Sequence, residues 1–151
     1  MGSQPAGLHP LSQKLKDPKT GYIPDVVDHL RVLLPLARKH GTKIVCNGGG
    51  ANPRAAAERV REMAAELGLH GTRVAVIEGD DLLATLDDVI SSDTDLTNMD
   101  TGETNLAGIR NRVVAANAYT DSSAIQAALT KGADVVIAGR VSDNALYVGP
   151  I

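Results

Sequence analysis

Several residue types are scarce in this chain, and each scarcity excludes a class of protein. Trp and Phe are absent and only three Tyr occur among 151 residues, so the aromatic platforms that stack on nucleic-acid bases cannot be built. The formal net charge of −3 likewise indicates no nucleic-acid partner. The single cysteine, Cys46, excludes an intrachain disulfide and suits a reducing, cytoplasmic compartment. No apolar run approaches the roughly 20 residues of a membrane-spanning helix, so we expect no membrane partner.

What the chain does contain is an alternation of short apolar runs and helical patterns. Strands are predicted at residues 44–46, 73–77, 112–118 and 133–138. Amphipathic helices are predicted at residues 24–40, where Pro35 should kink or split the helix, and at residues 53–67, 82–90 and 121–131. Alternating strands and helices predict one α/β domain over residues 1–151, with a three-layer, Rossmann-like open parallel sheet covered by helices on both faces.

Two segments break this alternation. Residues 1–22 show no clear periodicity, apart from a short helical turn expected near residues 11–16. Residues 91–111 are rich in Ser, Thr, Asp, Asn and Gly, and they keep no apolar period. A connection this long inside a compact domain is either a functional lid or a solvated excursion, and the sequence favours neither.

The organising stretch of the chain is residues 43–57, where a buried strand leads through three glycines into a helix. Asn52 is suited to cap that helix, and Pro53 suits its first position. Free N–H groups at such a helix start favour a phosphate or a carboxylate. The triple glycine matches neither the P-loop nor the GxGxxG pattern, so Asn47 and Asn52 can equally serve only the turn and the cap.

Polar residues follow each of the four predicted strands, and in a parallel sheet these ends share one edge, where ligands bind. Arg140 is the best candidate to bind an anion, with a surface ion pair to Asp143 as the alternative. The acidic run after the second strand offers metal ligands or helix caps, with Glu78, Asp80 and Asp81 as candidates. The predicted acid/base residues are Glu78, Asp80 and Asp143. The predicted ligand-binding residues are Asn47, Gly48, Gly49, Gly50, Asn52, Asn117, Tyr119 and Arg140.

Some catalytic groups are not indicated by the sequence. None of the four histidines falls at a predicted strand end, and the chain lacks CxxC, HExxH and GxSxG. No particular cofactor is therefore indicated. The partner that the strand-end residues predict is a small anionic molecule.

Six short motifs occur in order along the chain: DPKTGY (17–22), NGGGANP (47–53), EGDDL (78–82), MDTGE (99–103), NAY (117–119) and GRVSD (139–143). Together they resemble the N-terminal domain of the acyclic terpene utilisation AtuA family. The resemblance runs from about residue 17 to residue 150, and Gly49 stands where the family more often has Ala. Family members carry a glycine-containing strand before the first motif and continue beyond the last, so we expect this chain to be a partial domain.

The resemblance implies a role in the breakdown of citronellol- and geraniol-like compounds, alongside enzymes that act on branched acyl-CoA thioesters. The leading hypothesis is a metabolic enzyme domain that binds an acyl-CoA or a small anionic carboxylic substrate. The alternatives are a non-catalytic binding or assembly module of an acyl-CoA enzyme, and an inactive fragment. An exposed sheet edge in a partial domain would also favour self-association into a homo-oligomer.

Overall fold

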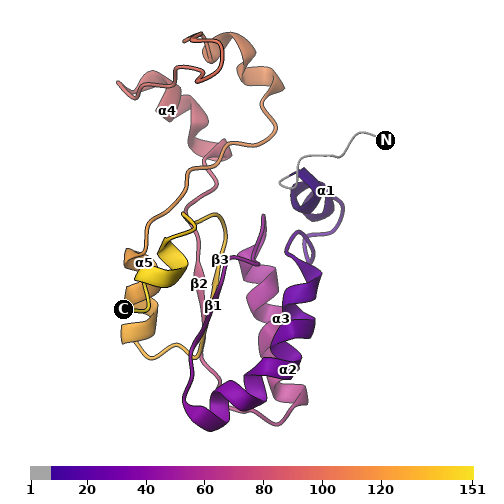
Figure 1. The fold of residues 1–151 in the computed structure, drawn as a ribbon. Helices are drawn as coiled ribbons and strands as arrows, with labels where there is room; N and C mark the ends of the chain where they lie inside the picture. Colours follow the sequence, from indigo (N-terminus) through magenta and orange to yellow (C-terminus); the bar gives the residue numbers. More distant parts are fainter. Residues whose placement is uncertain (1–7) are drawn as a thin grey trace.

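A computed structural model describes residues 8–151, and its centre is an open sheet of three parallel strands (Figure 1). The strands are β1 (Ile44–Cys46), β2 (Val74–Ile77) and β3 (Val135–Ala138), in the order β1-β3-β2. Ile44 of β1 and Val74 of β2 both lie opposite Val135, so the central strand is β3. The strands predicted at residues 44–46, 73–77 and 133–138 are therefore confirmed.

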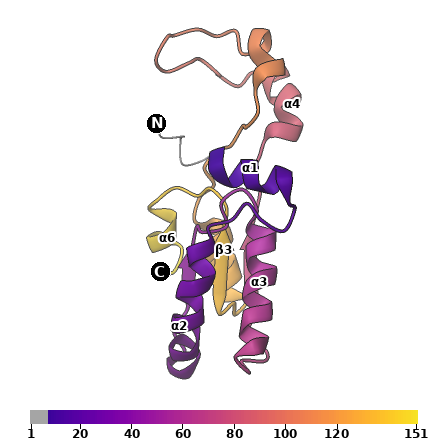
Figure 2. The same cartoon turned by 90° about the vertical axis from the view of Figure 1, so that its right-hand side faces the viewer.

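Helices pack on both faces of this sheet. Val135 and Ile137 of β3 pack in one core cluster with residues of α2 and α3, which lie side by side (Figure 2). Val136 and Ala138 point to the opposite face, into a cluster with Ile125 of α5. This alternation confirms an α/β chain with a parallel sheet. The helices are α1 (Leu8–Lys16), α2 (Pro24–His40), α3 (Pro53–Glu66), α4 (Leu86–Ser91), α5 (Ser123–Thr130) and α6 (Ala145–Val148), with 3-10 turns η1 (Leu83–Thr85) and η2 (Ala107–Arg112).

Helix α2 continues through Pro35, so of the two predicted outcomes, a kink or a split, the split is wrong. Pro35 lies on the exposed side, while four buried residues on the other side fix the helix to the core. Gly41 ends the helix with a φ of 69°, a left-handed conformation that glycine adopts without strain. The helical pattern of residues 24–40 also predicts Leu33 on the core side together with Leu30 and Leu34, but Leu33 is 50% exposed. The buried residues are Val27, Leu30, Leu34 and Ala37.

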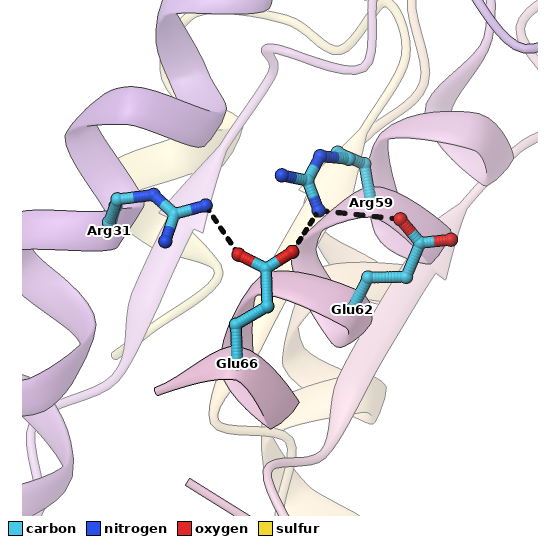
Figure 3. Close-up of polar contacts among 4 residues, drawn as sticks. All are labelled: Arg31, Arg59, Glu62 and Glu66. Carbon is cyan, nitrogen blue, oxygen red and sulfur yellow. Dashed lines mark hydrogen bonds and ion pairs between the residues drawn. The ribbon is translucent and has the colours of Figure 1, made fainter. Parts of the chain in front are cut away.

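An ion-pair network on the surface joins α2 to α3 (Figure 3). Arg31 of α2 donates to Glu66 of α3 at 2.7 Å, and Arg59 reaches the other oxygen of Glu66 at 3.0 Å. Arg59 also pairs with Glu62 at 3.3 Å. The hydrogen bond from Arg31, followed by that from Arg59, lowers the pKa of Glu66. The network marks the side of α2 that faces α3.

Asp134 connects the amino ends of all three strands. Its carboxylate accepts hydrogen bonds from the Arg73 backbone N–H and from Lys43 Nζ, both at 2.9 Å, and Arg38 Nη1 lies 2.9 Å away. Its backbone carbonyl accepts from the N–H of Ile44. Burial acts to raise the pKa of Asp134, but the Arg73 N–H and the Lys43 ammonium outweigh it, so the pKa lies below its usual value. Asp134 therefore holds the three strands together at their amino ends, which lie opposite to the strand ends that carry the polar motifs.

Residues 82–116 form an arm that rises beyond the carboxyl edge of the sheet (Figure 1). The strand predicted at residues 112–118 is wrong, because η2 occupies residues 107–112 and only isolated bridges follow, Asp81 with Asn117 and Thr120 with Val141. Residues 112–118 lie in the arm and at its base, where no neighbouring strand is available to pair with them. The helix predicted at residues 82–90 is shortened to η1 and α4, with only Leu86 buried.

Within residues 8–151, no helix combines the length and the apolarity that crossing a membrane requires.

Candidate site at the carboxyl edge of the sheet

Backbone hydrogen bonds bring the three strand ends together. The N–H of Gly49, just after β1, donates to the carbonyl of Ala138 at the end of β3 at 3.0 Å. The N–H of Gly139, just after β3, donates to the carbonyl of Ile77 at the end of β2 at 3.2 Å. The polar segments that follow the strands therefore start from one edge, as the parallel arrangement requires.

Asp80 is the buried carboxyl group at this edge, with 7% of its surface exposed. Its Oδ2 accepts a hydrogen bond from Asn117 Nδ2 at 3.1 Å, and its backbone carbonyl accepts from the N–H of Ala118 at 2.9 Å. A Cβ on Gly139 would lie 2.5 Å from Asp80 Oδ1, closer than two such atoms approach. The absence of a side chain at Gly139 thus allows the carboxylate to sit against the end of β3.

Arg140 is held at the same edge by its backbone. Its carbonyl accepts hydrogen bonds from the N–H and the hydroxyl of Thr120, each at 3.3 Å, and the next residue, Val141, is buried. Its side chain is half-buried and forms no ion pair within residues 8–151, so the alternative of a salt bridge to Asp143 is not found. A guanidinium without an acidic partner is available for an external anion.

The glycine turn packs closely against its surroundings. A Cβ on Gly48 would lie 2.1 Å from the Val26 side chain, and one on Gly49 would meet the Ala138 carbonyl at 2.6 Å. Gly50 has a φ of 56°, and a Cβ there would meet the Gly21 carbonyl at 2.9 Å. Each glycine therefore has a packing role. A phosphate-binding role for the turn remains a prediction.

Asn52 caps α3 and also ties down the segment that precedes α2. Its Oδ1 accepts from the N–H of Ala55 at 3.3 Å, which confirms the predicted cap. Its Nδ2 donates to the carbonyls of Pro18 and Thr20, each at 2.7 Å. These three bonds use both ends of the buried Asn52 amide. Asn52 therefore acts at this edge by holding the start of α3 against residues 18–20.

The acidic residues after β2 separate from one another. Glu78 is exposed and pairs with Arg54 from the first turn of α3. Asp81 is exposed and accepts from the N–H of Leu83 at 3.0 Å, as a turn residue does. Within residues 8–151, no group of three or more His, Cys, Asp or Glu side chains could hold a metal ion. The structure thus does not assemble the metal ligands that were considered for Glu78, Asp80 and Asp81.

Comparison with protein families matches residues 8–151 to the model described as "Acyclic terpene utilisation family protein AtuA". The chain belongs to the AtuA family. The comparisons with curated proteins and with solved structures gave no match. Three of the AtuA-type motifs, at residues 47–53, 78–82 and 139–143, are the segments that leave the three strand ends.

The AtuA-type residues at this edge differ in how closely the structure brings them together. Asp80 is in contact with Asn117 and with Gly139. Asn47, Asn117, Tyr119 and Asp143 are all exposed, with Tyr119 at 67%.

Sequence reasoning missed two contributors to this edge, Thr120 and Arg54. Thr120 anchors the Arg140 backbone, and Arg54 adds a second guanidinium beside Glu78. The position of Arg54 in the first turn after the glycine loop was the available signal.

Proposed function

We propose that this chain is a metabolic enzyme domain of the AtuA type, which acts in the cytoplasm on an acyl-CoA or another small anionic carboxylic substrate in terpenoid or branched-acyl catabolism. One observation carries the proposal. The polar segments after β1, β2 and β3 leave one edge of a parallel sheet, where Asp80 is buried and Arg140 has no acidic partner among residues 8–151. Family membership supplies the link to acyclic terpene utilisation.

In this proposal the residues at the edge divide into two roles. Arg140 binds the carboxylate or phosphate of the substrate, with Asn47, Asn117 and Tyr119 as hydrogen-bonding residues around it. The backbone of Gly48–Gly50 and the capped start of α3 form the wall of the site. Asp80 is the leading acid/base candidate, because it is buried and its orientation is fixed by Asn117. Glu78 and Asp143 are the exposed acid/base candidates.

We further propose that the three strands belong to a three-layer, Rossmann-like sheet. The two core clusters on opposite faces of β3 support this architecture. In such sheets the ligand lies outside the carboxyl ends of the strands, where the candidate residues are found.

A non-catalytic binding or assembly module is the second candidate function. It is favoured by the strand ends, none of which carries a histidine, and by the glycine turn, whose N–H groups at Gly49 and Ala51 donate to backbone carbonyls. Such a module would bind the acyl-CoA without converting it.

Thermal unfolding of the chain with and without CoA thioesters and divalent metals tests the proposal. A ligand present at 100 times its dissociation constant should stabilise the fold by about 2.7 kcal/mol. Arg140→Ala and Asn47→Ala should each weaken binding about tenfold or more, whereas Arg112→Ala, which removes an exposed arginine in η2, should leave it unchanged. Equal stabilisation of all variants would refute the assigned site. Binding without turnover would favour the binding module.

A further inference from the structure

Arg54 and Glu78 form an ion pair at the carboxyl edge of the sheet, although they are 24 residues apart in the sequence. Arg54 lies in the first turn of α3, and Glu78 directly follows β2. The Arg54 side chain is 67% exposed and that of Glu78 is 45% exposed, so both groups are open to solvent. An exposed ion pair of this kind is weak, and a ligand can therefore replace one of its members at little cost.

The backbone places Glu78 beside the end of the central strand β3. The N–H of Gly139, the first residue after β3, donates to the carbonyl of Ile77 at 3.2 Å. Ile77 packs in the core cluster on the α5 side of the sheet, so the next residue, Glu78, points to the opposite face, where α3 lies. The contact between Glu78 and Arg54 of α3 agrees with this direction.

Arg54 reaches the same place from the glycine turn. The residue before it, Pro53, packs against Gly49. A Cβ on Gly49 would lie 2.5 Å from Pro53 Cβ and 2.6 Å from the carbonyl oxygen of Ala138 at the end of β3. The start of α3 is thus held against the end of the central strand, and the Arg54 guanidinium meets the Glu78 carboxylate on the α3 side of that strand end.

The buried carboxylate of Asp80 lies on the same side. Ile137 of β3 packs in the cluster with α3, so Gly139, two residues further on, directs its Cβ position to that side. Asp80 Oδ1 lies 2.5 Å from this Cβ position. The Arg54–Glu78 pair and the leading acid/base candidate therefore share one side of the strand end.

We propose that Arg54 is a second anion-binding residue of this site and that Glu78 is its internal competitor. Without ligand, the Glu78 carboxylate occupies the Arg54 guanidinium. A carboxylate or phosphate group of the ligand displaces Glu78 and binds the fork of Arg54, while Arg140 binds another anionic group. The inference rests on the proposed function for the identity of the ligand, and it specifies a ligand with at least two anionic groups, as an acyl-CoA has.

This role of Glu78 differs from the acid/base role considered above. An acid/base residue contributes to turnover, and its replacement by an amide has no reason to act through Arg54. A competing carboxylate opposes binding, so its replacement should tighten binding, and only while Arg54 is present. The sign of the change in affinity and its dependence on Arg54 therefore separate the two roles.

Isothermal titration calorimetry of the full chain with isovaleryl-CoA tests the proposal. Glu78→Gln should raise the affinity about two- to fivefold, the factor that corresponds to the strength of an exposed ion pair. Arg54→Gln should lower the affinity about tenfold, because a charge-assisted contact is lost. In the Arg54→Gln background, Glu78→Gln should have no effect, because the guanidinium for which the carboxylate competes is absent.

Matched controls change the same charges elsewhere on α3. Glu62→Gln removes an exposed carboxylate that pairs with Arg59, and Arg61→Gln removes an exposed guanidinium. Both variants should bind isovaleryl-CoA with unchanged affinity. Circular dichroism checks that every variant is folded.

Inorganic phosphate is a second probe, and it separates failure of this inference from failure of the proposed function. A phosphate-dependent shift of the Arg54 Nε–H resonance without any binding of isovaleryl-CoA would refute the acyl ligand but support Arg54 as an anion-binding residue. Equal affinity of all variants for isovaleryl-CoA would overturn this inference and leave the proposed function in place. No shift of the Arg54 resonance with either probe would also overturn it.

Discussion

Asp134 is the single side chain on which the amino edge of the sheet most depends. It is 6% exposed, and Lys43, Arg73 and Arg38 all bind its carboxylate. We expect Asp134→Asn to lower the free energy of unfolding by about 2–3 kcal/mol at pH 7, because a neutral amide replaces the buried carboxylate that accepts hydrogen bonds from the Arg73 N–H and from the partly exposed Lys43. Urea unfolding measures the change, and Asp93→Asn, at an exposed position in the arm, is the control.

The effect of Asp134 should depend on pH in one direction. Its pKa is lowered in the folded state, so its contribution is complete above the pKa of the unfolded chain and disappears as the pH falls through the folded pKa. The difference between the original chain and Asp134→Asn should therefore be large at pH 7 and small near pH 2. An equal difference at both pH values would show that packing, and not charge, explains the loss.

Gly139 should be intolerant of even one methyl group. Its Cβ would lie 2.5 Å from Asp80 Oδ1, so Gly139→Ala should displace that carboxylate and cost about 1–3 kcal/mol of stability. In an Asp80→Ala background the same change should cost much less, because the clashing oxygens are gone. Equal costs in both backgrounds, measured by urea unfolding, would exclude Asp80 as the cause.

At the scale of elements, Asn52 joins two segments that are distant in sequence. It caps α3 and binds the carbonyls of Pro18 and Thr20. We expect Asn52→Ala to cost about 2–3 kcal/mol, more than the roughly 1 kcal/mol of an ordinary cap. Asn52→Ser keeps a cap acceptor and should lose only the tie to residues 17–20, which amide hydrogen exchange would detect there. Unchanged exchange at these residues would contradict this role.

The arm should be dispensable for folding. No residue of 82–116 belongs to the two core clusters, and its base is closed by Leu82 N–H donating to the Ala116 carbonyl at 2.8 Å. Replacing residues 84–114 with an Asn-Gly hairpin turn should leave one cooperative thermal transition. Loss of that transition would show that the arm supports the core. Reduced stabilisation by a CoA thioester in this variant would identify the arm as a lid, and unchanged stabilisation would identify a solvated excursion.

Sequence patterns predicted the elements that build the core better than those outside it. The strands at residues 44–46 and 133–138 were predictable because they are short continuous apolar runs, and helix α3 was predictable because its buried residues recur at helical spacing. The strand at residues 112–118 was wrong, since β propensity cannot show that no partner strand runs nearby. The partners of Asp134 and the ties of Asn52 come from segments 30 or more residues away, which no local pattern reveals.

At the scale of the whole molecule, the two ends of the strands have different properties. The amino edge holds Asp134, which contributes stability, and the carboxyl edge holds Asp80 and Arg140. Because these regions are separate, Arg140→Ala should alter ligand binding without unfolding the chain. The strand ends were predicted to converge from the sequence, whereas the buried position of Asp80 needed the structure.

The central claim, that the carboxyl edge binds an anionic acyl ligand, is tested most directly by following backbone amide resonances during titration with a branched acyl-CoA. We predict that shifts concentrate at residues 47–50, 79–81 and 139–143, that residues around Asp134 stay unchanged, and that Arg140→Ala abolishes the shifts at equal ligand concentration. No shifts at all, or shifts confined to the amino edge, would contradict this assignment.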